Sequence, residues 1–310
     1  MTGAGARCIG GAMGRIVLAA AVGAAAMLAG FVWRGDDAAE RGASGCAARV
    51  VSLSPHATET LFALGAGASV VAVDDYSNEP PAARELPRVG SYIDPDLEGI
   101  VAAGPDLVVL AGTQGALAER LAGLDLRALV VPDTRLEDVF GTIAALGDAV
   151  CRPGRAEALA ARLRGEIAAA AAGNGRPVRA VLVVDRPAGE LRQFFVAGPD
   201  NFLGDLLVAA GARNAFGDAP SAFVQVSLEP IVAAEPDLVV ELMPGASAAA
   251  AAERAAVWRR VAPGLPAVRR GMVAVLTEPW LPVPGPSVGR GAARLAALVA
   301  AARAAAEADR

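Results

Sequence analysis

The sequence predicts an α/β protein with two similar lobes, each built on a parallel-rich sheet, joined by one long rigid helix. Short β-rich runs alternate with helical runs along the chain, which indicates βαβ units. In addition, residues 96–110 (DLEGIVAAGPDLVVL) and residues 227–241 (SLEPIVAAEPDLVVE) agree at eleven of fifteen positions. These copies lie 131 residues apart, near half of the chain, so they indicate two related lobes rather than a solenoid of short repeats.

The first half begins with a β-rich run at residues 49–54. Ser54 fits a helix N-cap and Pro55 the first helical position, so a helix is predicted to begin there and to stop at Gly65 and Gly67. A strand at 68–75 precedes a loop rich in Pro and Gly at 76–95. The elements predicted next are a helix at 97–104, a strand at 105–112, a helix at 116–124, a strand at 127–133 and a helix at 135–150.

A helix predicted at 154–173 has no breaker between its terminal glycines, and at 1.5 Å per residue it would span roughly 30 Å. The elements predicted next are strands at 179–185 and 193–198, a helix at 200–212, a segment at 212–218 that parallels 68–75, and a loop at 219–226. The repeated unit follows. A strand at 272–276, a loop at 277–291 and a helix from about Ala292 complete the chain. The predicted division is an N-terminal lobe at 46–150, a spanning helix at 151–175, a C-terminal lobe at 176–302 and a tail at 303–310.

Residues 1–45 are predicted to be a signal peptide or an N-terminal membrane anchor. Arg7 and Arg15 precede an apolar run of eighteen residues, 16–33. A cleaved signal has an apolar core of about 7–15 residues, whereas a spanning helix needs about 17–25. The run therefore predicts export to a periplasmic or extracytoplasmic location, and leaves open whether residues 16–33 stay as an anchor in the inner membrane.

Charge and cysteine content exclude two classes of site. The net charge of −5 gives no basic patch of the kind that nucleic-acid binding requires. Cys8 lies in the targeting segment, which leaves Cys46 and Cys151 in the exported part. In an oxidising compartment they are candidates for a disulfide, and two unpaired thiols are the alternative. There is no Cys-x-x-Cys motif or Cys/His cluster, so a thiol-based metal site is not expected.

Four segments, in this order, resemble the substrate-binding proteins of metal-chelate ABC importers. The periplasmic cobalamin receptors are most similar, and haem and siderophore receptors share the superfamily. The segments are residues 49–67, 74–109, 194–216 and 223–240. The resemblance covers residues 48–302 and implies a fold like that of class III periplasmic binding proteins, with a shallow cleft between lobes whose closure the spanning helix limits. It also implies partnership with an ABC permease dimer and its ATPase, and no required cofactor.

The same resemblance implies that aromatic side chains in the cleft contact the chelate. Tyr76 and Tyr92 occupy the loop at 76–95, and Phe223 occupies the loop of the other lobe. Trp280 lies in the Pro-rich loop at 277–291, where burial in regular structure is difficult. For each of them the alternative is that the ring merely covers a loop or joins the core. Aromatic rings with sparse polar groups suit a ligand with a large apolar face.

Polar candidates are fewer. His56, the single histidine, could be an axial ligand to cobalt or iron, but a solvated histidine at a helix start is the preferred interpretation. One histidine also argues against zinc and manganese receptors, which cluster their ligands. Arg290 and Arg186 are the candidates for contacts to an anionic ferric siderophore.

Glu98 and Glu229 are the equivalent glutamates of the two repeat copies. By resemblance, each docks against arginines of the permease dimer, and a two-fold symmetric partner explains a glutamate in both lobes. The alternative is that each glutamate merely favours a helix N-terminus.

The predicted function is an extracytoplasmic substrate-binding protein that captures cobalamin or another cobalt corrinoid and delivers it to an ABC importer. A haem or ferric-siderophore receptor is the alternative. An anchored sensor without a transport role and an enzyme are less favoured interpretations. For an enzyme, Ser52, Ser54 and His56 form no evident triad and have no apparent carboxylate partner.

Overall fold

The computed structural model describes residues 45–171 and 175–309. Residues 45–310 form one compact unit. Cys8 and the apolar run at 16–33 lie outside the described residues, so the predictions made for them are not addressed. Within the described part, no helix is both long enough and apolar enough to cross a membrane.

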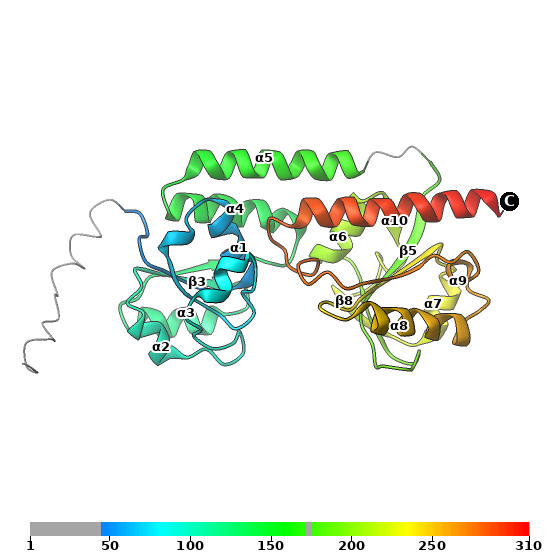
Figure 1. Cartoon of the computed structure of the whole chain (residues 1–310), viewed down its shortest axis with the longest axis horizontal. Coiled ribbons are helices and arrows are strands. Elements are labelled where there is room, and N and C mark those ends of the chain that lie inside the picture. The colour runs from blue at the N-terminus through cyan, green and yellow to red at the C-terminus, as the bar shows by residue number, and fades with distance from the viewer. Residues whose placement is uncertain (1–44, 172–174, 310) are drawn as a thin grey trace, which may run out of the picture. The chain divides into compact units, whose positions relative to one another are not determined.

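The N-terminal lobe, which contains β3 and α1–α4 in Figure 1, is built on a four-stranded parallel sheet in the order β2-β1-β3-β4. Its strands are β1 (Val50–Leu53), β2 (Val70–Val73), β3 (Leu107–Ala111) and β4 (Ala128–Val131). Its helices are α1 (Pro55–Ala63), α2 (Leu97–Ala102), α3 (Gly115–Ala122) and α4 (Leu136–Ala149), with 3₁₀ turns at Gly67–Ser69 and Pro81–Glu85. Strands β1 and β3 are buried along their whole length. Helices cover both faces of this sheet, which explains the nearly continuous hydrophobic runs of its strands.

The C-terminal lobe has a mixed sheet in the order β10-β9-β5-β6-β8, with β7 also paired to β5. Its strands are β5 (Val178–Asp185), β6 (Phe194–Ala197), β7 (Ala212–Asn214), β8 (Phe223–Val226), β9 (Leu238–Leu242) and β10 (Val273–Leu276). Its helices are α6 (Phe202–Ala209), α7 (Leu228–Ala233), α8 (Ala248–Val261) and α9 (Pro266–Arg269). The loop predicted at 219–226 is wrong for residues 223–226, which form β8 and pair antiparallel with β6.

The repeated sequence forms the same helix–strand unit in both lobes, α2–β3 and α7–β9. In each unit the aspartate of the Pro-Asp pair accepts a hydrogen bond from the backbone N–H of an arginine: Arg49 to Asp106 at 3.0 Å, and Arg179 to Asp237 at 3.1 Å. The side chain of each arginine also donates, at 2.8 Å, to a carbonyl just after the short helix of its unit. These bonds satisfy carbonyls that a helix end leaves without intrahelical partners. The repeat therefore joins a helix to a buried strand by the same contacts in both lobes.

Two long helices complete the fold. Helix α5 (Pro153–Ala170) packs against α4 and α10 (Val288–Ala308), and it lies above both in Figure 1. One hydrophobic core continues from β1 and α1 through α4 and α5 to α6, α10 and β5. The expected two-lobed fold with a long connecting helix is confirmed. The tail expected at 303–310 is wrong for residues 303–308, which continue α10, and this helix begins before Ala292.

Cys46 and Cys151 form a disulfide, with Cα atoms 5.4 Å apart. The bond joins the segment before β1 to the turn between α4 and α5. Beside it, the backbone N–H of Ala47 donates to the carbonyl of Ala149 at 2.7 Å. Of the two interpretations left open by the sequence, the structure contains the disulfide.

A candidate ligand cleft between the lobes

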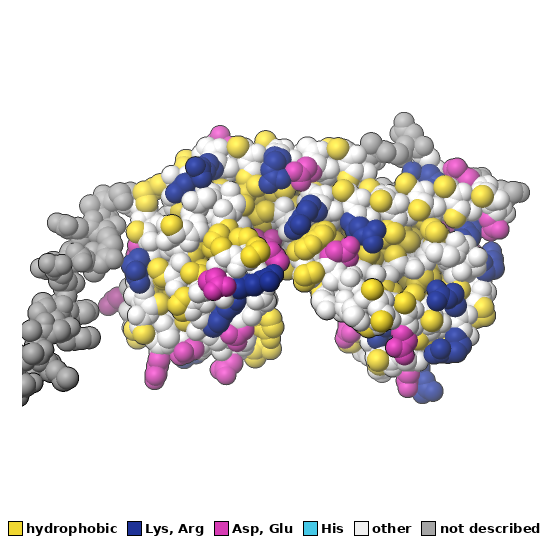
Figure 2. Space-filling model, viewed as in Figure 1, with side chains coloured by type: hydrophobic (Ala, Val, Ile, Leu, Met, Phe, Trp, Pro, Cys, Tyr) yellow, Lys and Arg dark blue, Asp and Glu magenta, His cyan; other side chains and the backbone are white. Residues whose placement is uncertain are grey.

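The surface in Figure 2 is hollowed between the N-terminal and C-terminal lobes. In the N-terminal lobe the loop after β2 carries the candidate residues Tyr76 and Tyr92 and is hydrogen-bonded to the loop after β3, and these loops leave the carboxyl ends of parallel strands. Open α/β sheets bind ligands at that edge. The candidate site is therefore built from these loops and from the exposed aromatic side chains of the other lobe.

Tyr76 is 62% exposed and lies in the loop that follows β2. A buried network holds its loop. The Asp74 carboxylate accepts hydrogen bonds from the Ser77 hydroxyl and, at 3.2 Å, from the backbone N–H of Tyr76. Ser77 also hydrogen-bonds to Thr58 of α1 at 2.8 Å, and burial raises the pKa of Asp74. Because Asp74 and Ser77 anchor this loop in the interior, the Tyr76 ring is left on the surface.

Tyr92 is also exposed, and its loop is tied to the end of β3. Its phenol hydrogen-bonds to the Thr113 hydroxyl, and Gln114 donates its amide to the Tyr92 carbonyl at 3.2 Å. Gln114 in turn accepts from the backbone N–H of Ala111, the last residue of β3, at 2.9 Å. Both tyrosines therefore lie on loops fixed to neighbouring elements of the sheet.

Phe223 lies on β8, which Figure 1 places on the side of the C-terminal lobe nearest the N-terminal lobe. It is 49% exposed. Strand register adds a residue that the sequence analysis missed. Gln225 pairs with Phe195 of β6, and Phe223 pairs with the next residue but one on that strand, so Phe195 and Phe223 share one face. Phe195 is 44% exposed, so this edge of the sheet presents two phenyl rings at the surface. The sequence pair Phe194-Phe195 could not show which ring faces outward.

Trp280 and Arg290, both predicted ligand contacts, lie together. The guanidinium carbon of Arg290 is 4.3 Å from the centroid of the Trp280 ring, within the range of a cation–π contact. Trp280 is half-buried against the main core. Arg290 is exposed and donates to the Ser287 hydroxyl at 3.0 Å. The structure thus presents Trp280 with a cation over one face.

His56 is 3% exposed, so the preferred interpretation of a solvated helix-terminal histidine is wrong. Its Nδ1 lies 2.6 Å from the Ser54 hydroxyl, and burial lowers its pKa to about 4. Ser54 is the N-cap residue as expected, but its hydroxyl bonds the imidazole instead of capping the helix. An axial metal ligand needs an accessible ring nitrogen, and this imidazole is enclosed. Arg186 is likewise buried, against Glu241, and does not line a surface.

Glu98 and Glu229 occupy equivalent positions in the first turns of α2 and α7, and both are exposed. Neither carboxylate forms an ion pair within residues 45–171 and 175–309. One helical turn later, Val101 and Val232 are 48% and 46% exposed. Each lobe therefore carries the same unpaired carboxylate and exposed valine at positions i and i+3, which are neighbours on a helix surface.

Comparison with known proteins identifies the family. A family model described as periplasmic binding protein matches residues 50–279. The chain belongs to this family. It is similar to the vitamin B12-binding protein of Vibrio parahaemolyticus, with 28% identity over 77% of this chain and 84% of that protein. Among solved structures it is similar to the periplasmic vitamin B12 binding protein of Vibrio cholerae, with a TM-score of 0.71 and 26% identity, covering 83% of this chain and 98% of that chain. It is also similar to a periplasmic haem-binding protein from Roseiflexus, with a TM-score of 0.69 and 28% identity, covering 82% and 98%.

These relatives are solute-binding proteins rather than enzymes, and they support an extracytoplasmic periplasmic binding protein of the cobalamin, haem and siderophore superfamily. Among the described residues, no group of three or more His, Cys, Asp or Glu side chains is placed to hold a metal ion. The candidate site exposes the rings of Tyr76, Tyr92, Phe195 and Phe223 beside polar side chains such as Asp75 and Gln225. Such a surface can bind a large, partly apolar molecule.

Proposed function

We propose that this periplasmic binding protein binds cobalamin or another corrinoid between its lobes and delivers it to the permease of an ABC importer. The observation that carries the proposal is the set of exposed aromatic side chains contributed by both lobes: Tyr76, Tyr92, Phe195 and Phe223. Aromatic rings such as these bury a large area when they pack on a flat macrocycle. The similarity to proteins named for vitamin B12 binding supports the same ligand class.

Haem is the second candidate ligand. The exposed Tyr92 phenol favours it, because a tyrosine oxygen can ligate haem iron. The similarity to a haem-binding protein supports this alternative equally well. A ferric siderophore is less well supported, because Arg290 already lies over Trp280 and Arg186 is buried.

Titration of the purified protein with cyanocobalamin is expected to quench its tryptophan fluorescence saturably, while haemin and ferrichrome have no effect. Tyr76→Ala and Phe223→Ala should each raise the Kd about tenfold, the effect of losing about 1.4 kcal/mol of ring contact. Val261→Ala is the matched control, since Val261 is an exposed residue at the end of α8. A Soret shift with haemin, without any response to cyanocobalamin, would reject the corrinoid and support haem.

Docking on the permease is proposed to use the Glu98–Val101 and Glu229–Val232 pairs. Two equivalent patches on one chain fit a partner with two equivalent subunits. Exposed ion pairs contribute about 0–1 kcal/mol each. These glutamates would therefore determine how the protein is oriented on the permease more than how tightly it binds.

The Glu98→Ala/Glu229→Ala double variant is expected to bind the permease complex in vesicles several-fold more weakly, with an unchanged Kd for ligand. Each single variant should lose up to about fivefold. Glu119→Ala, on the exposed surface of α3, is the matched control. Loss of ligand binding in the double variant would show instead that these carboxylates belong to the cleft.

Delivery to a permease requires an extracytoplasmic location. The disulfide between Cys46 and Cys151 supports an oxidising compartment. Residues 16–33 would act as a signal peptide or as an inner-membrane anchor, and the mass of the mature protein from membrane and soluble fractions would distinguish the two.

A further inference from the structure

The start of α10 makes a buried contact with the N-terminal lobe. The Ser287 hydroxyl donates to Oε2 of Glu59 in α1 at 3.1 Å, across 228 positions of sequence. Ser287 is buried, and Glu59 is 8% exposed. This hydrogen bond therefore links the two lobes directly through two largely buried side chains.

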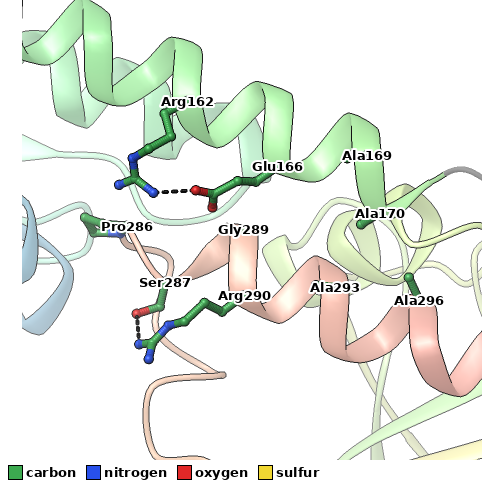
Figure 3. Close-up of a pocket in the computed structure, with 10 residues that line it drawn as sticks. All are labelled: Arg162, Glu166, Ala169, Ala170, Pro286, Ser287, Gly289, Arg290, Ala293 and Ala296. Atoms are coloured by element: carbon green, nitrogen blue, oxygen red, sulfur yellow. Dashed lines mark hydrogen bonds and ion pairs between the residues drawn. The ribbon is translucent and has the colours of Figure 1, made fainter.

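The contact continues to the candidate ligand site. The Ser287 oxygen also accepts from Nη2 of Arg290 at 3.0 Å, the bond drawn in Figure 3, and the Arg290 guanidinium lies over Trp280. Glu59, Ser287, Arg290 and Trp280 thus form an unbroken series of contacts from one lobe to the other.

Close packing holds this series in place. A Cβ added at Gly285 would lie 3.1 Å from Oε2 of Glu59 and 3.4 Å from the Cα of His56. A side chain at position 285 would require the Glu59 carboxylate or the loop to shift by a few tenths of an ångström. Glycine at this position therefore lets the loop that carries Trp280 lie close to Glu59.

The charged surroundings of Glu59 come from three elements. Burial raises the pKa of Glu59 to about 7, and the hydrogen bond from Ser287 opposes this. Glu79, in the loop after β2, raises the pKa further, and Arg290 of α10 lowers it. Glu59, Glu79 and Arg290 also line one pocket of about 330 Å³. His56 on α1 is neutral near pH 7, because its pKa is about 4.

A second charged pair lies on α5 and faces the start of α10. Arg162 and Glu166 are paired at 2.5 Å across a groove of about 730 Å³ from Arg290 (Figure 3). Within residues 45–171 and 175–309, Arg290 is hydrogen-bonded to Ser287 and not to this pair. The orientation of Arg290 therefore depends on Ser287 and, through it, on Glu59.

We propose that Glu59 is a positioning residue that acts through Ser287 to hold Arg290 over Trp280, so that protonation of a carboxylate in one lobe changes the surroundings of a tryptophan in the other. Ionised Glu59 accepts the Ser287 proton in a charge-assisted hydrogen bond and attracts Arg290. Protonation removes both effects and leaves the guanidinium less constrained. The consequence for ligand binding rests on the proposed function; the coupling between Glu59 and Trp280 does not.

The coupling is tested without ligand, by following tryptophan emission of the full-length protein from pH 5 to 9. Subtracting the spectrum of Trp280→Phe isolates the Trp280 signal. We expect two plateaus with a midpoint near pH 7 in the wild type and no transition in Glu59→Gln, which keeps an acceptor for Ser287 but does not titrate. Glu79→Gln is the matched control, and it should keep the transition with a slightly lower midpoint.

Circular dichroism establishes that each variant is folded, and Ser287→Ala provides a second test by removing the linking hydroxyl. It should reduce the amplitude of the transition while Glu59 remains. A wild-type Trp280 signal that is constant across this range, or an unchanged transition in folded Glu59→Gln, would overturn the proposal.

A separate measurement addresses ligand binding. The Kd for cyanocobalamin should change about two- to fivefold between pH 6 and pH 8 in the wild type and remain constant in Glu59→Gln. A pH-independent Kd in the wild type would overturn the link to binding. Failure to bind cyanocobalamin at either pH would refute the proposed ligand and leave the fluorescence result intact.

Discussion

Replacing Glu241 with glutamine is expected to lower the free energy of unfolding by about 3–5 kcal/mol. Glu241 lies on β9 with its side chain fully buried. Its Oε1 is 2.9 Å from Nε of Arg186 and also contacts Arg254, while Trp258 donates its indole N–H to Oε2 at 2.9 Å. One buried carboxylate therefore contacts two guanidinium groups and accepts a hydrogen bond from an indole.

The size of the effect follows from what remains after the substitution. Burial lowers the pKa of Arg186, and the Glu241 charge opposes that shift. Glutamine removes the only anion in direct contact with the two guanidinium groups among the described residues, so both stay buried without a counter-charge. Breaking a buried pair from one side is costly for this reason, even where replacing the whole cluster by apolar residues is not.

Denaturant unfolding followed by circular dichroism measures the loss. Arg254→Met should cost less, because Glu241 keeps its contact with Arg186. Glu137→Gln is the control at an exposed pair, with an expected change of about 0–1 kcal/mol. A loss below about 1 kcal/mol for Glu241→Gln would show that the two arginines are compensated by water or by backbone carbonyls alone.

Much of the fold could be predicted because its signals are local. Buried parallel strands appear as hydrophobic runs, and the repeated unit revealed the second lobe. Strand β8 was missed because its half-buried residues follow a Pro-Ser turn and pair only with a distant strand. Helix α8 received no prediction because it is rich in alanine, with only Val257 and Trp258 buried.

The residues of the candidate site likewise include some that have a local signal in the sequence and others that depend on distant contacts. Exposed rings on loops, such as Tyr76, could be predicted from loop composition and family resemblance. Whether Phe194 or Phe195 faces outward depends on register with β8, which the sequence does not contain. The burial of His56 and Glu59 depends on the loop at 277–287, more than two hundred residues away. Polar residues at a helix start are usually solvated, so this arrangement left no local signal.

Single substitutions of His56 and Glu59 are expected to change the pH dependence of stability in opposite directions. The folded pKa of His56 is about 4, below the ordinary 6.5. Its contribution is therefore present above pH 6.5 and lost as the pH falls toward 4. The folded pKa of Glu59 is about 7, above the ordinary 4.5, so its contribution is present below pH 4.5 and lost as the pH rises through 7. Each of these two pKa shifts corresponds to about 3 kcal/mol of the free energy of unfolding.

In the wild type the two contributions oppose each other between pH 4.5 and 6.5, and the sum changes little. In His56→Gln, stability relative to wild type should fall by about 3 kcal/mol as the pH rises from 4 to 6.5. In Glu59→Gln, it should rise by a similar amount between pH 4.5 and 7. Comparison with the wild type at each pH removes the titration of other groups, Asp74 and Asp133 included, whose pKa values are raised mainly by burial.

Denaturant unfolding at intervals of half a pH unit measures these differences, and the double variant provides the control. With both titrating groups removed, the profile should return to that of the wild type within the error expected for neighbouring sites. Parallel profiles for the two single variants would mean that His56 and Glu59 titrate as one unit, with a shared proton across the first turn of α1. In that case the midpoint of the Trp280 signal would also move in His56→Gln. If the two groups titrate independently, the midpoint would stay where it is in the wild type.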